Sequence, residues 1–327
     1  MKLYTDVVEG YLDFADYAAP DSATFEAWAR GVADDEEVCA WIAELPPVKQ
    51  QPNLVFAAAR WHGVEAPGPY AGLREALLGD DGRIRDTILS RATQTNEVGR
   101  LATLLPAFGL VAQDRPLALL EVGASAGLNL FPDRWGYRWR TDDGVVELGP
   151  EPRLDCRVKG EAPLPNAVPP VAWRGGIDLN PLDVTDDDAM AWLTMLVWPE
   201  HDDRRGLLRH AIEIARADPP HLDKGDLLED LPRLVEQASA HGTVVVFHSA
   251  VIAYLAPADR ERYHELVTRL VADGACHWVS NEGKNVLPPV TRTGPPIPEG
   301  KQTFVLGLDG QAVAWTHGHG RSMRWIS

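Results

Sequence analysis

The stretch PLALLEVGASAGLNL, from Pro116 to Leu130, holds the residues best suited to bind a ligand. An apolar run of strand length carries Glu121 near its end, and five small residues follow from Gly123 to Gly127. Leu128 is then expected to begin a helix. A buried strand, a glycine turn and a helix start are typical of the ligand crevice of a parallel α/β sheet. Glycine lets the backbone approach a ligand closely, and the first N–H groups of a helix point outward, so we expect a ligand site here.

Three interpretations of this loop compete. The pattern Glu121-x-Gly123-x-Ser125-x-Gly127 resembles the first motif of the S-adenosylmethionine methyltransferases, with Ser125 at the position of the middle glycine. The same five residues also read G-x-S-x-G, the nucleophile elbow of the α/β-hydrolases. The third interpretation is a tight turn whose small residues serve packing alone. We favour the first.

Under the methyltransferase interpretation, the loop binds S-adenosylmethionine as a cofactor. Gly123 and Gly127 let the main chain pass the methionine carboxylate and the adenosine, with Ser125 between them. Asn129 and the helix N-terminus donate hydrogen bonds to that carboxylate, and Glu121 accepts from the amino group. The sulfonium is already activated, so the protein has only to align donor and acceptor and to remove a proton.

The resemblance to class I methyltransferases extends over about residues 115–320. It implies an acid at the end of the second strand, about 20 residues past the glycine loop, that holds the ribose hydroxyls. Asp142 and Asp143 fall at a predicted turn between strands instead. Asp178 lies about 50 residues on and ends a predicted strand, so it is the candidate ribose contact.

The hydrolase interpretation requires Ser125 as the nucleophile, followed along the chain by an acid and a histidine. Asp178 with His248 or His317 satisfies that order. An α/β-hydrolase has several strands before its elbow, however, and residues 1–110 show no alternating strand pattern. We therefore rank this function second. A non-catalytic protein that binds S-adenosylmethionine or a nucleotide is the third hypothesis.

A second polar segment, TQTNEVGR from Thr93 to Arg100, falls within a helix that we predict from about Arg83 to Leu105. Glu97 and Arg100 share one helix face, and Asn96 and Arg100 form an i,i+4 pair. One explanation is a solvated helix face with an ion pair. The other places the helix over the glycine loop, with Asn96 and Arg100 binding the substrate and Glu97 acting in catalysis. We favour the latter.

His248 follows the apolar run TVVVF at the carboxyl end of a predicted parallel strand, where open α/β sheets keep their ligand crevice. It is our candidate general base, and a histidine merely hydrogen-bonded at a strand end is the alternative. Trp198, beside Glu200, is a candidate substrate contact, with a core position as the alternative. His317 and His319 lack a third ligand nearby in sequence, so no metal site is predicted.

The composition is that of a globular protein with a large negative net charge. The 327 residues include 48 acidic and 31 basic side chains, for a net charge of −17. Nucleic acids and anionic membranes bind basic patches, so neither is an expected partner, and a small neutral or cationic substrate suits the charge better. The three cysteines form no C-x-x-C pair, no apolar run reaches about 18 residues, and no signal-peptide pattern is found. These features predict a soluble cytoplasmic protein.

The pattern of elements predicts an α/β fold in two parts. Residues 1–112 are expected to form a helical N-terminal cap domain. Residues 113–327 are expected to form a Rossmann-like, methyltransferase-type domain with a mostly parallel sheet. An antiparallel hairpin, from about Lys301 to Trp315, is expected to close the sheet at its C-terminal end. Residues 149–172 are rich in proline and are predicted to be a connecting loop.

Six short strings are spread over the whole chain. They are Gln51-Pro52-Asn53, Thr93 to Arg100, Leu119 to Leu130, Val197 to Glu200, Val245 to Ser249 and His317 to Gly320. In this order they resemble DUF2332, a bacterial family of unknown function, and the combination is specific. The family has no established activity, so the resemblance implies membership of the family and little about function.

Overall fold

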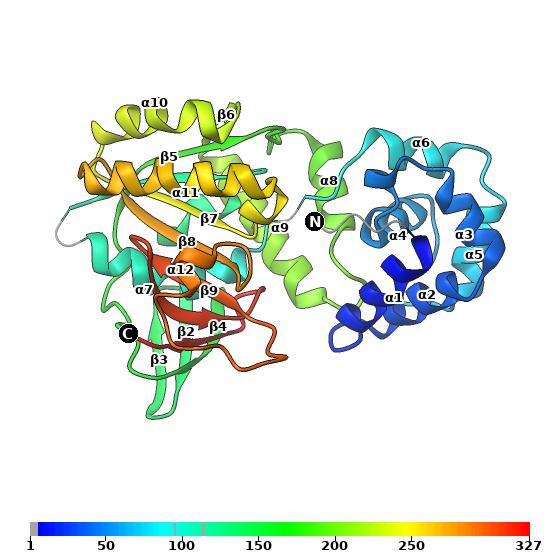
Figure 1. Ribbon diagram of the computed structural model, residues 1–327, viewed down its shortest axis with the longest axis horizontal. Coiled ribbons are helices and arrows are strands. Elements are labelled where there is room, and N and C mark those ends of the chain that lie inside the picture. The colour runs from blue at the N-terminus through cyan, green and yellow to red at the C-terminus, as the bar shows by residue number, and fades with distance from the viewer. Residues whose placement is uncertain (1–5, 95, 113–114) are drawn as a thin grey trace. The chain divides into compact units, whose positions relative to one another are not determined.

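The computed structural model describes residues 6–94, 96–112 and 115–327, which form two compact units (Figure 1). The helical unit comprises Met1–Thr95 and Asp187–Gly206. The sheet unit comprises Asn96–Asp186 and Leu207–Ser327. This division differs from the boundary expected at residue 112, because the sheet unit begins earlier and a later segment returns to the helical unit.

The helical unit consists of amphipathic helices whose starts are marked by capping side chains. Asp6, Ser22 and Asp35 each accept a hydrogen bond from a backbone N–H in the first turn of the helix that follows. Pro52 begins another helix, at a position where a backbone N–H would have no hydrogen-bond partner within the helix. The absence of an N–H in proline therefore costs nothing there. The α-helices are α1 (Val7–Ala18), α2 (Ala23–Ala33), α3 (Glu36–Ala43), α4 (Pro52–Trp61), α5 (Tyr70–Leu78), α6 (Arg83–Ser90) and α8 (Asp187–Met195), with a 3₁₀ turn at Pro47–Lys49.

Aromatic side chains form the core of the helical unit. The ring centroids of Phe25, Trp28 and Phe56 lie 5.1–5.8 Å from one another. The ring of Trp198 packs on Phe25 with its centroid 5.7 Å away. The segment 187–206 therefore completes a core that residues 1–95 begin.

Two partly buried arginines hold this returning segment in place. Arg60 donates hydrogen bonds to two backbone carbonyls at and just beyond the end of α8. The guanidinium of Arg91 lies 4.6 Å from the ring centroid of Trp61 and 5.0 Å from that of Trp192, and it pairs with Asp188 at 2.7 Å. Cation–π contacts of this kind are strongest where water is excluded, so they stabilise the join between the two segments.

The sheet unit contains one mixed sheet of eleven strands, in the order β3-β2-β4-β11-β10-β9-β8-β7-β1-β5-β6. Six neighbouring pairs are parallel and four are antiparallel, so the fold is α/β with a mostly parallel sheet. The strands are β1 (Leu117–Val122), β2 (Gly136–Thr141), β3 (Gly144–Leu148), β4 (Arg153–Lys159), β5 (Val171–Asp178), β6 (His221–Lys224), β7 (Thr243–Ser249), β8 (His277–Gly283), β9 (Phe304–Leu308), β10 (Gln311–Thr316) and β11 (Ser322–Trp325).

The strands β6, β5, β1, β7 and β8 form a continuous parallel block. All six residues of β1 are buried, as expected for a parallel strand covered on both faces. Later strands lie on both sides of β1, with β5 and β6 on one side and β7 and β8 on the other. The direction of strand addition therefore reverses at β1. The loop of small residues from Gly123 to Gly127 follows the carboxyl end of this strand.

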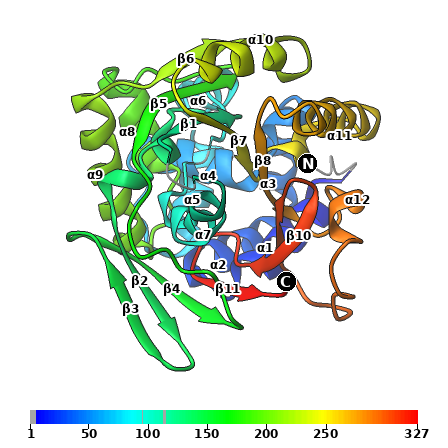
Figure 2. The same cartoon turned by 90° about the vertical axis from the view of Figure 1, so that its left-hand side faces the viewer.

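Helices cover the sheet on both faces. α10 (Leu227–Ser239) packs on β1, β5 and β7, and α11 (Pro257–Ala272) lies beside α10 and on β8 (Figure 1). α7 (Leu101–Ala112) contacts β2 and β4 as well as β7 and β8, so the sheet curves around it (Figure 2). α9 (Asp202–Ala217) and the short α12 (Pro288–Thr291) complete the set. Among the described residues, no helix is long and apolar enough to cross a membrane.

The helix predicted from Arg83 to Leu105 is wrong, because α6 ends at Ser90 and α7 begins at Leu101. Side chains from elsewhere bind the carbonyls in between: Lys49 donates to that of Arg91, and Trp192 donates to that of Ala92. These tertiary hydrogen bonds replace the helical ones.

Pro106, which directly follows the predicted end of that helix, lies inside α7. A proline has no N–H for the carbonyl four residues earlier, which is that of Ala102. The indole N–H of Trp139 donates to that carbonyl at 2.8 Å, so the orphaned acceptor is satisfied from β2. The proline is therefore tolerated in a buried helix.

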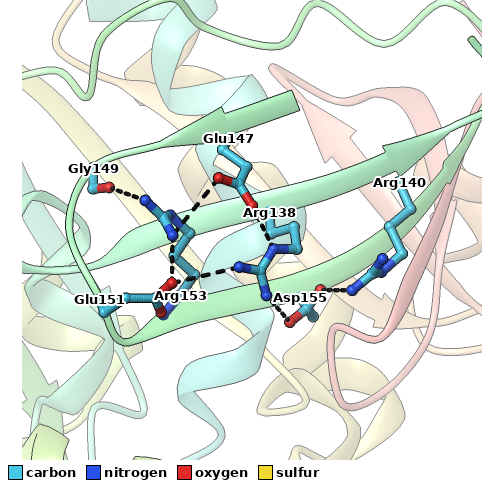
Figure 3. A network of polar contacts seen from close by, with 7 residues as sticks. All are labelled: Arg138, Arg140, Glu147, Gly149, Glu151, Arg153 and Asp155. Carbon is cyan, nitrogen blue, oxygen red and sulfur yellow. Dashed lines mark hydrogen bonds and ion pairs between the residues drawn. The ribbon is translucent and has the colours of Figure 1, made fainter. Parts of the chain in front are cut away.

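The region predicted as a loop at 149–172 contains β4, and β6 and β11 were also not predicted. The hairpin of β2 and β3 and that of β9 and β10 are confirmed. The second hairpin does not close the sheet as expected, because β11, β4, β2 and β3 continue the sheet beyond β10. The β2–β3 hairpin and β4 carry a surface network in which Arg138 contacts Glu147, Glu151 and Asp155 (Figure 3). Exposed ion pairs of this kind contribute little to stability, and the network places no group at the candidate site.

Candidate functional site

The glycine loop, residues 123–127, leaves the carboxyl end of β1 in conformations that favour glycine. The φ angles are 67° at Gly123, 51° at Ser125 and 69° at Gly127. Ser125 is thus a non-glycine residue in the left-handed region, at a cost of about 1–2 kcal/mol. A 3₁₀ turn of three residues, Leu128–Leu130, follows in place of the expected helix. The predicted role of a helix N-terminus at this loop is therefore wrong.

Side chains from two other segments fix the loop. Asp178 Oδ2, at the carboxyl end of β5, accepts a hydrogen bond from Ser125 N at 2.8 Å, and its Oδ1 accepts from Asn180 N at 2.8 Å. Asn96 Oδ1 accepts from Leu128 N at 3.2 Å. Asp178 and Asn96, two residues singled out from the sequence, thus meet the glycine loop although they are far from it in the chain.

Protein atoms fill the space beside the glycines of the loop. A Cβ on Gly123 would lie 2.4 Å from Val251 Cγ1, and a Cβ on Gly127 would lie 2.8 Å from Pro220 Cγ. Together with their positive φ angles, these contacts explain why both positions are glycine. The packing interpretation of the sequence therefore accounts for the glycines themselves, and any ligand function must rest on the polar groups around them.

Four buried polar atoms around the loop have no hydrogen-bond partner within the described part of the chain. They are Asn96 Nδ2, Glu121 Oε2, Ser125 Oγ and Asn129 Oδ1, and each of these residues is at least nine-tenths buried. A buried polar atom without a partner costs about 1–3 kcal/mol, so such atoms are rare in folded proteins. Four of them in one cluster indicate a place where a polar ligand would supply the missing bonds.

Glu121 is the charged member of this cluster. Its Oε1 accepts a hydrogen bond from Asn129 Nδ2 at 3.0 Å. Burial raises the pKa of the Glu121 carboxyl to about 8, while the Asn129 hydrogen bond and the nearby Arg100 guanidinium lower it and the charge of Asp178 raises it further. Burial outweighs the other effects, so the carboxyl is mostly protonated at neutral pH.

The 3₁₀ turn at Val98–Arg100 and the tail at 317–320 pack against each other closely. Arg100 Nε donates to the carbonyl of Gly318 at 2.7 Å, and its Nη1 donates to that of Ser249 at 2.8 Å. A Cβ on Gly320 would lie 2.0 Å from Gly99 O. The face that Glu97 and Arg100 were expected to share on a helix does not exist. Arg100 instead joins the tail to the end of β7.

The same turn carries Glu97, the second candidate for catalysis. Glu97 Oε2 lies 3.2 Å from His319 Nδ1, and the Glu97 side chain is almost fully buried. His317 Nδ1 accepts a hydrogen bond from His319 N at 3.0 Å. The two histidines of the tail thus have carboxylate and backbone partners. Within the described residues, no group of three or more His, Cys, Asp or Glu could hold a metal ion.

His248, the candidate general base, is completely buried with both ring nitrogens hydrogen-bonded. Its Nδ1 lies 2.7 Å from Glu282 Oε1, and its Nε2 accepts from the indole of Trp278 at 3.1 Å. Glu282 Oε1 also accepts from the backbone N–H groups of Val251 and Ile252. In this arrangement the histidine helps to fix the loop whose Val251 packs on the glycine loop.

The comparisons with known proteins identify the family and nothing more specific. The family model described as "Uncharacterized protein conserved in bacteria (DUF2332)" matches residues 8–325. The chain belongs to DUF2332. No curated protein and no solved structure matches the chain.

The DUF2332 strings in the helical unit have mutual contacts in its core. Trp198 is 6% exposed, and its indole donates to Asn53 Oδ1 at 2.9 Å. Glu200 accepts from the backbone N–H of Thr24 at 2.8 Å, at the start of α2. Trp198, predicted as a substrate contact, is therefore placed in an aromatic core, as the alternative interpretation had it.

Sequence reasoning missed two residues that shape the candidate site, and it considered His319 only as a metal ligand. Val251 packs on the glycine loop, Glu282 accepts from the backbone N–H of Val251, and His319 lies beside Glu97. Glu282 lies near the carboxyl end of β8, where an acid was a usable signal. Val251 carries no chemical signature, and only its packing reveals it.

Proposed function

We propose that this DUF2332 protein binds S-adenosylmethionine at the glycine loop and transfers its methyl group to a small molecule. The cluster of four buried, unpartnered polar atoms around the loop carries this proposal. Their chemistry is that of a site for a zwitterion, because acceptors and a donor both lack partners. The methionine part of S-adenosylmethionine is such a zwitterion.

The strand order supports the same assignment. Numbering the parallel block β1, β5, β6, β7 and β8 by position in the chain gives the order 3-2-1-4-5 across the sheet. That is the order of the first five strands in the Rossmann fold, whose ligands bind outside the carboxyl ends of the strands where the order reverses. The glycine loop follows the strand at that position, and Asp178 ends the neighbouring strand.

Different residues around the loop would bind different groups of the ligand. Glu121 Oε2 and Asn129 Oδ1 would accept hydrogen bonds from the ammonium group, and Asn96 Nδ2 would donate to the carboxylate. Asn96 takes the role first expected of Asn129, whose amide nitrogen is bonded to Glu121. Asp178 would accept from the ribose hydroxyls, since each carboxylate oxygen can accept more than one hydrogen bond. The cofactor supplies an activated methyl group, and these residues would hold it in a fixed orientation.

Calorimetric titration with S-adenosylhomocysteine tests the proposal. We expect micromolar binding to the native protein and binding at least about tenfold weaker to Asn129→Leu, which loses a hydrogen bond to a charged group. Asn53→Leu is the matched control, because it makes the same change in the helical unit, and its affinity should equal that of the native protein. Absence of binding to native protein at millimolar ligand would overturn the proposal. Binding without methyl transfer in an acceptor screen would instead favour a non-catalytic binding protein.

A serine hydrolase is the second candidate, favoured by the left-handed backbone and unpartnered hydroxyl of Ser125. A hydrolase needs a histidine to activate that hydroxyl. Of the two histidines proposed from the sequence, His248 has both nitrogens engaged elsewhere, and His317 Nδ1 accepts from the backbone N–H of His319. Hydrolysis of p-nitrophenyl acetate by the native protein, lost in Ser125→Ala, would establish this function in place of methyl transfer.

A further inference from the structure

We propose that the ligand-free protein keeps Glu121 neutral and exchanges its proton for the ammonium group of the entering ligand. The inference rests on the proposed function for the identity of the ligand. It adds that the site selects ligands that carry a protonated amine, and that binding releases a proton.

The geometry around Glu121 argues for a neutral carboxyl. The side chain is 4% exposed and has no basic partner in contact within the described residues. Arg100 is the nearby cation, but its guanidinium donates to the carbonyls of Ser249 and Gly318. Asp178, at the end of the adjacent strand, adds a negative charge. A buried carboxylate without a counter-ion is costly, and protonation removes that cost.

Entry of an ammonium group changes this balance. The O–H bond of Glu121 breaks, its proton passes to the solvent buffer, and the carboxylate accepts a hydrogen bond from the ammonium. Asn129 Oδ1 accepts a second one. The charge of the pair is then neutralised inside the protein, so the ionised form of Glu121 becomes the stable one. A ligand without the amine cannot drive this exchange.

Calorimetry in two buffers measures the released proton. Titrating S-adenosylhomocysteine at pH 7.0 in phosphate and in Tris, which differ in ionisation enthalpy, gives the number of protons released. With a carboxyl pKa of about 8, we expect about 0.9 proton at pH 7.0 and about 0.25 at pH 8.5. 5′-Methylthioadenosine is the matched control ligand, because it has the adenosine without the amino acid, and it should release none. Glu121→Gln should also release none and should bind S-adenosylhomocysteine at least about tenfold more weakly.

The outcomes separate this inference from the proposed function. Binding of S-adenosylhomocysteine without proton release would overturn the inference and leave the proposed function standing. Absence of binding by both ligands would overturn the proposed function. A direct titration of the ligand-free protein then decides the inference by itself: a ¹³C carboxyl signal, assigned with Glu121→Gln, should titrate near pH 8, and titration below pH 6 would refute it.

Discussion

Replacing Glu121 with glutamine should change how the stability of the protein depends on pH. The variant keeps the shape of the side chain, and its amide carries N–H donors, as a protonated acid carries an O–H donor. The native carboxyl has a pKa raised from 4.5 to about 8 by burial. Below pH 4.5 it is neutral in both folded and unfolded protein. Between pH 4.5 and 8 only the unfolded state is ionised, so native stability falls as the pH rises, and above pH 8 the loss is complete.

The size of the effect follows from the same pKa values. Each pH unit in that interval lowers the free energy of unfolding by about 1.4 kcal/mol. From pH 4.5 to about 8 the contribution of Glu121 therefore amounts to about 5 kcal/mol. The glutamine side chain cannot ionise, so the variant loses none of this free energy of unfolding as the pH rises. Its stability relative to native protein should rise by that amount across the interval.

Denaturant unfolding of both proteins, followed by circular dichroism from pH 5 to pH 9, measures the difference at each pH. Other titrating groups are common to both proteins and cancel. Glu147→Gln is a control whose difference from native protein should stay nearly constant from pH 5 to pH 9. Arg138 lowers the pKa of Glu147, so the stability that this carboxylate contributes is lost only as the pH falls below about 4.5. A native-minus-variant difference for Glu121 that stays constant with pH would refute the argument that burial keeps this carboxyl neutral.

Two further pairs of variants test the packing of each unit by chemical denaturation. Arg91→Ala should destabilise the helical unit by about 2 kcal/mol, because it removes the cation between two indole rings. Asp188→Asn should cost under about 0.5 kcal/mol, because that carboxylate is 64% exposed. In the sheet unit, Gly320→Ala should cost at least about 2 kcal/mol more than Gly300→Ala. Both glycines have φ above 70°, but only at Gly320 would the new Cβ meet backbone, whereas at Gly300 it would meet open space. If the two variants of either pair lost equal amounts of stability, the contacts described for that pair would be contradicted.

Strands that are wholly apolar or joined by a short turn could be predicted from the sequence. The runs that form β1 and β7 are buried and β-rich, and the Asp-Gly turns mark two hairpins. β4 was missed although Leu154, Cys156 and Val158 alternate as buried positions. The surrounding prolines favoured a loop for this region, because proline is rare inside strands, and this outweighed the alternation of apolar residues.

The break between α6 and α7 could not be predicted from local pattern. Its cause is a set of hydrogen bonds from Lys49 and Trp192, which lie about 40 and 100 residues away in the chain. Asp178 was chosen from the sequence and does reach the glycine loop, since the strand that it ends is the neighbour of β1. The intervening β2, β3 and β4 explain its distance along the chain. The partners of His248 were not predicted, because they lie on β8, about 30 residues later in the chain.

The path of the chain between its two units bears on how the protein is made. About 90 residues of the sheet unit, Asn96–Asp186, leave the ribosome before the segment that carries Trp192 and Trp198. Domains usually fold as they emerge, N-terminal first. Here the first unit to be synthesised cannot complete its aromatic core until residue 206 has been added, so its apolar side chains stay available to chaperones throughout that interval. Chains that stop before residue 187 should accumulate as aggregates, and a fragment that lacks residues 1–95 should expose the two tryptophans.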